Sequence, residues 1–157
     1  MINKNGYLKL IDFGSSKIIL RGQNGKTEKT KSFVGTTEYV APEILLNLGH
    51  DYKVDYWSLG VLIYEMLEGR TPFYATDHDH QRDIGKIYAN ILKGYEAVDR
   101  HHRYDLIEKL CQSNPEKRIN YEEILNHTWF EHYDILAVKC QCSVAPFIPD
   151  SSAIRQE

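Results

Sequence analysis

The chain has 157 residues, enough for one domain with a hydrophobic core, and 42% hydrophobic with 26% charged residues is an ordinary globular composition. A formal net charge of −3 argues against nucleic-acid binding through the overall field. Three cysteines, an odd number, suggest no disulfide framework. We therefore expect ordinary thiols at Cys140 and Cys142, and a reduced, cytoplasmic protein.

The first twenty residues predict a small β element. In residues 6–13 the side chains of Tyr7, Lys9 and Ile11 alternate with those of Leu8, Leu10 and Asp12, which predicts a short strand that runs into a turn at Gly14. Residues 16–20 could form a second short strand. The polar, lysine-rich stretch that follows, residues 22–31, predicts a loop.

Helical patterns begin at Pro42, a residue suited to the first turn of a helix. The second helix is expected over residues 52–68. It is apolar on most sides, which is typical of a helix in the middle of a core. It is also the most apolar window of the chain, but it is too short to span a membrane and contains Glu65.

Further helices are predicted towards the C-terminus. Amphipathic stripes occupy residues 84–92 and 106–111. Asn120 and Glu123 resemble a capping box at the start of another helix. Beyond Phe130 the pattern fades into a segment expected to be extended. The sequence thus predicts a mainly α unit with a small β element.

Five motifs follow one another in a fixed order. They are D-F-G at 12–14, GTTEYVAPEI at 35–44, DYWSLGVLIYEMLEGRTPF at 55–73, NPEKRI at 114–119 and NHTWF at 126–130. The series resembles the C-terminal lobe of a eukaryotic serine/threonine protein kinase. With the NGYLKLIDFGSSK stretch and the closing APFIP, it most resembles the cGMP-dependent kinases.

The resemblance implies a fold, a reaction and cofactors. The fold is the large lobe of the α+β protein-kinase fold, incomplete here, over residues 1–132, with the start of a C-terminal tail over 133–157. The parent protein would transfer the γ-phosphate of ATP to serine or threonine near basic residues. Asp12 matches the aspartate that binds the Mg²⁺ on the ATP phosphates, since a hard carboxylate suits a hard cation. The alternative for Asp12 is a carboxylate that caps its own turn.

The activation segment supplies further candidates. Ser32 falls where this group is phosphorylated, and Lys17 matches a cation that would meet the phosphate; the alternative is an ordinary loop serine. Thr36 matches a threonine that hydrogen-bonds near the catalytic base. The substrate-binding positions implied by the resemblance are Phe33, Thr37, Glu38, Val40 and Glu65.

Glu65 also stands out by chemistry, because a carboxylate inside an apolar stretch needs a partner or a cleft; the alternative is a solvent-facing helix residue. Thr37 departs from the proline usual in the family. Glu43 and Arg118 match a structural ion pair, Asp55 a carboxylate that holds the catalytic loop, and Trp57 a core anchor.

The polar insert ATDHDHQRD, residues 75–83, is longer than usual in the family. Its histidines and aspartates could bind a metal weakly, but a solvated loop is the preferred interpretation.

The printed sequence contains no Gly-rich loop, no strand lysine in a V-A-I-K context and no H-R-D-L catalytic loop, so the catalytic Asp is absent. We expect this chain alone to be inactive, and its central helix to expose apolar surface. The expected partners are protein substrates with basic residues near the phosphoacceptor, and an N-terminal lobe or upstream regulatory domain. The alternative is a catalytically dead fragment that binds partners or acts as a regulatory decoy.

Overall fold

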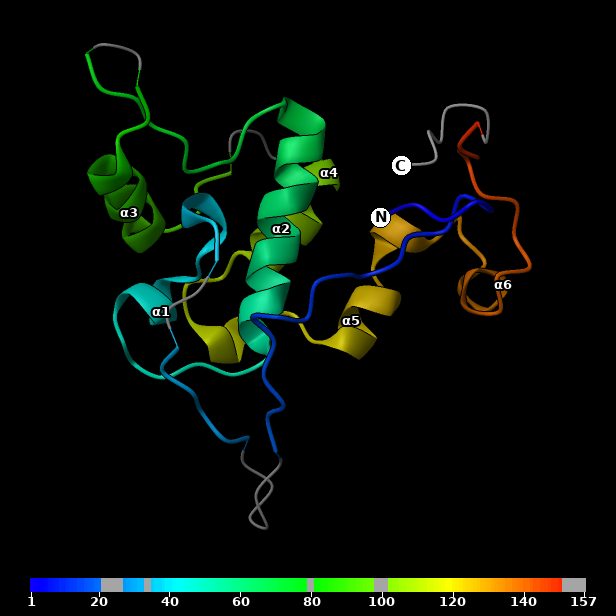
Figure 1. Cartoon of the computed structure of the whole chain (residues 1–157), viewed down its shortest axis with the longest axis horizontal. Helices are drawn as coiled ribbons and strands as arrows, with labels where there is room; N and C mark the ends of the chain where they lie inside the picture. Colours follow the sequence, from blue (N-terminus) through cyan, green and yellow to red (C-terminus); the bar gives the residue numbers. More distant parts are fainter. Residues whose placement is uncertain (21–26, 33–34, 79–80, 98–101, 151–157) are drawn as a thin grey trace. The chain divides into compact units, whose positions relative to one another are not determined.

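The protein is described here by a computed structural model (Figure 1). It describes residues 1–20, 27–32, 35–78, 81–97 and 102–150, the side chains of His102 and Arg103 excepted. The chain divides into two compact units. One runs from Lys17 to Trp129, and the other joins Met1–Ser16 to the segment that begins at Phe130.

Helices account for the regular structure of the described residues. They are η1 (Thr37–Tyr39), α1 (Pro42–Leu45), α2 (Lys53–Glu68), α3 (Ile84–Lys93), α4 (His102–Leu110), η2 (Pro115–Lys117), α5 (Tyr121–Leu125), η3 (Thr128–Phe130) and α6 (Ile135–Lys139). The predicted capping box of α5 is confirmed, because Asn120 and Glu123 cap each other's backbone N–H groups. The first helix is shorter than its pattern and ends before Gly49.

The two strands expected in the first twenty residues are not formed. The described part of the chain has isolated β-bridges only, at Ile2 with Leu8, Thr30 with His50 and Thr76 with Arg82. An alternating pattern becomes a strand only when a neighbouring segment continues the hydrogen-bond ladder, and here each pairing stops after one bridge. The small β element is therefore a set of single bridges.

The core of the larger unit lies between α2 and α4, which pack directly on each other (Figure 1). Trp57 and Val61 of α2 and Leu106 of α4 are fully buried. The helices approach closely because residue 60 is glycine. A Cβ atom there would lie 2.6 Å from the Cys111 sulfur.

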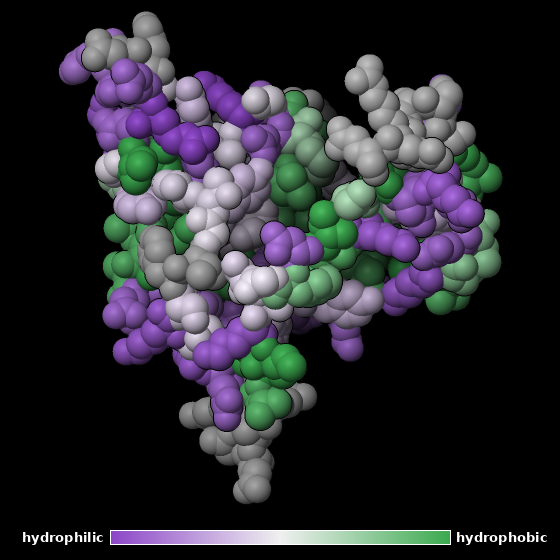
Figure 2. All heavy atoms as spheres, viewed as in Figure 1, coloured by the Kyte–Doolittle hydropathy of each residue, from purple (hydrophilic) through white to green (hydrophobic). Residues whose placement is uncertain are grey.

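One face of α2 is open to solvent, which corrects the expectation of a helix buried on most sides. Leu59, Leu62 and Met66 follow one another at helical spacing and are 36%, 43% and 69% exposed. Figure 2 shows hydrophobic surface over the C-terminal half of α2. The apolar surface expected on this helix is thus present. No helix in the described ranges is both long enough and apolar enough to cross a membrane.

The smaller unit is held by contacts between its two segments. The Tyr7 hydroxyl donates a hydrogen bond to the carbonyl oxygen of Ser143. The segment expected to be extended contains the short helix α6, capped by Asp134. Cys140 and Cys142 are joined in a disulfide, so the expectation of two separate thiols is wrong. Gln141, at φ 56°, turns the chain so that the two Cα atoms lie 5.4 Å apart, within disulfide reach.

Candidate functional site

The η1 segment lies against both α2 and α3 and brings several predicted site residues together. Its backbone is fixed from α2, because the Ser58 hydroxyl lies 3.0 Å from the Tyr39 carbonyl oxygen and donates to it. Pro42 then starts α1 directly after the segment. The short η1 turn is therefore attached to the central helix.

Tyr39 links η1 to Glu65. Its hydroxyl donates a hydrogen bond to the Glu65 carboxylate on α2. Burial of the phenol, this hydrogen bond and the charges of Glu65 and Glu38 raise the pKa of Tyr39 to about 12. Glu65 thus has the partner that its place in an apolar helix requires. The sequence analysis did not single out Tyr39, although its position beside Glu38 was available as a signal.

Glu38 is buried and faces an arginine from the polar insert. The Arg82 Nε atom lies 3.0 Å from Glu38 Oε1; the Glu38 side chain is 4% exposed and that of Arg82 is 55% exposed. The second carboxylate oxygen, Oε2, is buried and has no hydrogen-bond partner in the described part of the chain. The site is therefore an acidic position with one of its two oxygens in use.

The other predicted substrate positions surround this turn. Thr37 begins η1 and is half-buried, and Val40 is 3% exposed directly after it. Thr36 precedes the turn and is exposed, and its carbonyl oxygen accepts from the Tyr39 N–H. Phe33 lies outside the described residues. A pocket formed by these side chains stays a prediction.

Glu43 and Arg118 lie together, as the resemblance implies. Arg118 Nη1 and Nη2 donate to the two oxygens of Glu43 at 2.8 and 3.1 Å. Nη1 also donates to the Lys53 carbonyl oxygen, and Nε and Nη2 donate to that of Gln112. All five N–H groups of the guanidinium are thus bonded, inside a side chain with no exposed surface.

Trp57 connects this ion pair to the core. The Arg118 guanidinium carbon lies 5.4 Å from the centre of the Trp57 ring, and Phe73 stacks on that ring with centroids 5.3 Å apart. The stack thus joins Trp57 of α2 to Arg118 at the end of η2 and to Phe73 in the segment after α2. Trp57 therefore has the position of a core anchor.

Asp55 lies exposed in the first turn of α2. Burial of its carboxyl group raises the pKa of Asp55, and the charge of His50 opposes that rise. Its carboxylate receives no hydrogen bond from the described residues. The expected role in holding a catalytic loop stays a prediction.

The predicted phosphosite is linked to Lys17 through a third residue. Lys17 Nζ donates to the Thr30 hydroxyl at 2.8 Å, and that hydroxyl lies 3.2 Å from the Ser32 hydroxyl. Thr30 is buried and exchanges backbone hydrogen bonds with His50. Sequence reasoning missed Thr30, since nothing in the pattern distinguishes it from other loop threonines.

Asp12 lies in the smaller unit, exposed, with φ 62°. Its Oδ1 atom accepts from the Gly14 N–H at 3.2 Å. This is the turn-capping geometry that was the alternative to metal binding, and an aspartate tolerates that left-handed backbone. One carboxylate oxygen caps the turn, and the other has no hydrogen bond from the described residues.

No group of three or more His, Cys, Asp or Glu side chains that could hold a metal occurs among the residues that the structure describes. Asp12 alone supplies one hard oxygen donor, and Mg²⁺ in nucleotide sites commonly uses one or two carboxylates with phosphate and water oxygens. The metal-binding role of Asp12 stays a prediction. Part of the histidine insert, including Asp79 and His80, lies outside the described residues.

His127 is a buried titratable residue that sequence reasoning missed. Its Nε2 atom lies 2.9 Å from Asp105 Oδ2, and its Nδ1 atom accepts from the Trp129 N–H at 3.1 Å. Hydrogen bonds from Lys109 and His127 lower the pKa of Asp105. With both ring nitrogens in use, His127 ties α4 to the start of η3.

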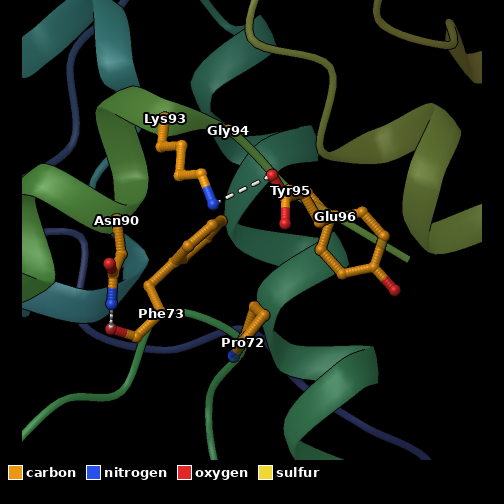
Figure 3. A pocket seen from close by; sticks show the side chains of 7 residues that line it. All are labelled: Pro72, Phe73, Asn90, Lys93, Gly94, Tyr95 and Glu96. Carbon is orange, nitrogen blue, oxygen red and sulfur yellow. Dashed lines mark hydrogen bonds and ion pairs between the residues drawn. The ribbon is translucent and has the colours of Figure 1, made fainter. Parts of the chain in front are cut away.

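A cavity of about 220 Å³ lies between the segment after α2 and the end of α3 (Figure 3). Three of its polar side chains are already paired: the Asn90 amide donates to the Phe73 carbonyl oxygen, and Lys93 meets Glu96 at 3.0 Å. The Tyr95 hydroxyl points away from the cavity. The η1 region is therefore the stronger candidate site.

Comparison with known proteins gives the family. Residues 1–130 match the model of the protein kinase domain. The cGMP-dependent protein kinase, isozyme 2 forms cD5/T2, of Drosophila melanogaster is 42% identical over an alignment of 143 positions, which covers 85% of this chain and 14% of that protein. The cGMP-dependent protein kinase, isozyme 1, of the same organism is 40% identical over an alignment of 158 positions, gaps included, which covers 94% of this chain and 19% of that protein.

The human relative is also a cGMP-dependent protein kinase. The cGMP-dependent protein kinase 2 of Homo sapiens is 40% identical over an alignment of 156 positions, which covers 93% of this chain and 19% of that protein. The chain thus spans between 14% and 19% of the length of these three relatives. The mostly helical, strand-poor fold agrees with this assignment. The chain belongs to the protein kinase family and is similar to its cGMP-dependent serine/threonine kinases.

Proposed function

We propose that this chain is part of the C-terminal lobe of a kinase that transfers the γ-phosphate of ATP to serine or threonine near basic residues. One observation carries the substrate preference: Glu65 bonds to the hydroxyl of Tyr39, the residue next to Glu38, and the charges of both carboxylates act on the Tyr39 phenol. Two acidic groups around one rigid turn suit a peptide with arginine or lysine side chains.

Asp12 is the residue that would hold Mg²⁺ for ATP. When bound, the metal neutralises charge on the transferring phosphate. The free oxygen of Asp12 supports this role. Ser32 is proposed as the activation phosphosite, with Lys17 close enough to approach a phosphate once the Thr30 contact rearranges.

The 157-residue chain alone is proposed to be inactive, because its sequence supplies neither the catalytic Asp nor the ATP lysine. The test is transfer of labelled phosphate from ATP to an arginine-containing serine peptide by the purified chain. We expect no turnover above background. Turnover that Asp12→Asn abolishes would contradict the proposal.

The kinase activity itself is testable in a chimera. The human cGMP-dependent protein kinase 2 would keep its catalytic domain up to the D-F-G motif and receive residues 12–150 of this chain from there. We expect peptide phosphorylation that Asp12→Asn removes. Glu65→Gln should raise KM for an arginine-containing peptide more than it lowers kcat, since uniform binding is lost. A folded chimera with no Asp12-dependent activity would refute the proposed reaction.

A further inference from the structure

The contact between Arg82 and Glu38 fills the proposed acidic site from within the chain. Arg82 Nε is 3.0 Å from Glu38 Oε1, which is the distance of a direct ion pair. A basic residue of a substrate would use the same carboxylate. The position is thus already occupied by a group of the chemistry that we propose for the ligand.

This occupancy is incomplete. A guanidinium commonly meets a carboxylate through two parallel N–H···O bonds, and Arg82 makes one contact, to Oε1. Oε2 of Glu38 remains buried and without a hydrogen-bond partner among the residues described. A second guanidinium that reached both oxygens would therefore form a better pair than Arg82 does.

Arg82 belongs to the base of the polar insert, where backbone hydrogen bonds join the two ends of the insert. Thr76 and Arg82 form a β-bridge, the Asp77 N–H donates to the Gln81 carbonyl oxygen at 2.8 Å, and the Asp83 N–H donates to that of Ala75 at 3.0 Å. Asp83 also caps the start of α3. The base of the insert is thus anchored to α3, and Arg82 extends from it over η1.

The exposed fractions show which member of the pair can leave. Glu38 belongs to the fixed η1 turn and is almost fully covered, whereas more than half of the Arg82 side chain is in contact with solvent. Movement of Arg82 exchanges its one contact for water at small cost. It also removes the cation nearest to Glu38, which strengthens the attraction for an incoming basic group.

We propose that Arg82 is an internal competitor, which occupies Glu38 and which an arginine of the substrate must displace. The proposal rests on the proposed function of Glu38 in binding basic substrates. Arg82 thereby determines how tightly basic residues bind, without contacting the reacting atoms.

The test is peptide binding by the full 157-residue chain. The probe is a fluorescent peptide with two arginines before an alanine that replaces the phosphoacceptor, and a glutamine-for-arginine peptide is its control. Fluorescence anisotropy would give Kd for the wild type, Arg82→Ala and Lys93→Ala. Lys93 is a matched control, since it is exposed, lies on α3 and pairs with Glu96 instead of Glu38.

We expect Arg82→Ala to bind the arginine peptide about two- to fivefold more tightly than the wild type, the range set by an exposed ion pair. Lys93→Ala should leave Kd within about twofold, because screened charges away from the site contribute little. Arg82→Lys should lie between the wild type and Arg82→Ala, since it keeps the charge and loses the Nε contact.

Two failures are distinguishable. Equal affinity of the wild type and Arg82→Ala would overturn the competition and leave the acidic site intact. Binding of the arginine peptide by neither protein would overturn the proposed substrate site, and the competition with it. The Arg82 Nε–H signal in NMR adds a check without peptide: it should shift in Glu38→Gln, and an unchanged signal would refute the ion pair.

Discussion

Two glutamate–arginine pairs in the larger unit differ in what surrounds the arginine. Arg118 is fully enclosed, and its five N–H groups bond to Glu43 and to two backbone carbonyl oxygens. Arg82 is mostly exposed and makes one contact with Glu38. The same chemical pair thus serves as a fixed junction in one place and as an exchangeable contact in the other.

The difference lies in what removal of each arginine would leave behind. Without Arg118, the Glu43 carboxylate would remain in a closed interior between α1, α2 and η2's end. Without Arg82, water could reach Glu38 from the side that the arginine covered. Desolvation of the remaining carboxylate is therefore severe in the first case and mild in the second.

Arg118→Ala should give the largest effect. Loss of the guanidinium leaves Glu43 buried without its counter-ion and frees two carbonyl oxygens, so the free energy of unfolding should fall by about 3–5 kcal/mol. Urea unfolding followed by circular dichroism would measure it. A loss below about 1 kcal/mol, the range of exposed pairs, would erase the distinction between the two pairs.

Arg118→Lys should lower the free energy of unfolding by less than Arg118→Ala and by more than a change at Arg82. Lysine keeps the charge but has three N–H groups without the planar fork, so some of the five hydrogen bonds must be lost. We expect a loss of about 1–3 kcal/mol in the same urea experiment. The matched variant Arg82→Lys should change stability by less than about 0.5 kcal/mol, and equal losses at both positions would contradict the assignment.

Tyr39 should make stability fall in alkaline solution. In the folded chain its pKa is raised to about 12, above the ordinary value of 10.0. The neutral phenol therefore stabilises the fold fully below about pH 10, and this contribution is lost as the pH rises from 10 towards 12.

Urea unfolding at pH 9 and pH 11 would test this. The fall in stability should be steeper for the wild type than for Tyr39→Phe, which removes the titrating group but leaves other tyrosines in place. At pH 7 the same variant should lose about 1 kcal/mol, because the hydrogen bond to Glu65 is gone. Identical slopes for the two proteins would show that the Tyr39 contact with Glu65 does not form.

Arg82→Ala should have the smaller effect on stability of the two arginine-to-alanine changes. We expect a loss below about 1 kcal/mol, as for exposed ion pairs, and a loss that shrinks further in high salt. Thermal unfolding at low and high ionic strength would measure it. A loss as large as that of Arg118→Ala would mean that Arg82 is a fixed part of the fold.

Periodicity and caps predicted much of the helical structure. Residue spacing along the chain was enough to predict the long helix near residues 52–68, the apolar stripe of α3 and the capping box of α5. These elements depend on neighbours in sequence, so local spacing determines them. The N-terminal strands failed because a strand depends on a partner elsewhere in space. The short helix α6 was missed, since its cap at Asp134 precedes only a brief apolar run.

The candidate site was predictable only in part. Family motifs placed Glu43 with Arg118, although nothing in local spacing connects them. The contact of Arg82 with Glu38 could not be predicted, because it depends on how the insert turns back over η1. Ser58 likewise gave no signal, since a helix serine usually bonds to its own preceding turn, as this one also does with Val54.

Gly60 makes Cys111 a natural reporter of how the two central helices separate. The thiol lies against Gly60 of α2, directly after the end of α4, and burial raises the pKa of Cys111 to about 12. An alkylating reagent that reacts with thiolates can modify Cys111 near neutral pH only after the two helices separate. The alkylation rate of Cys111 therefore measures how often the contact between α2 and α4 opens, and no engineered label in the core is needed.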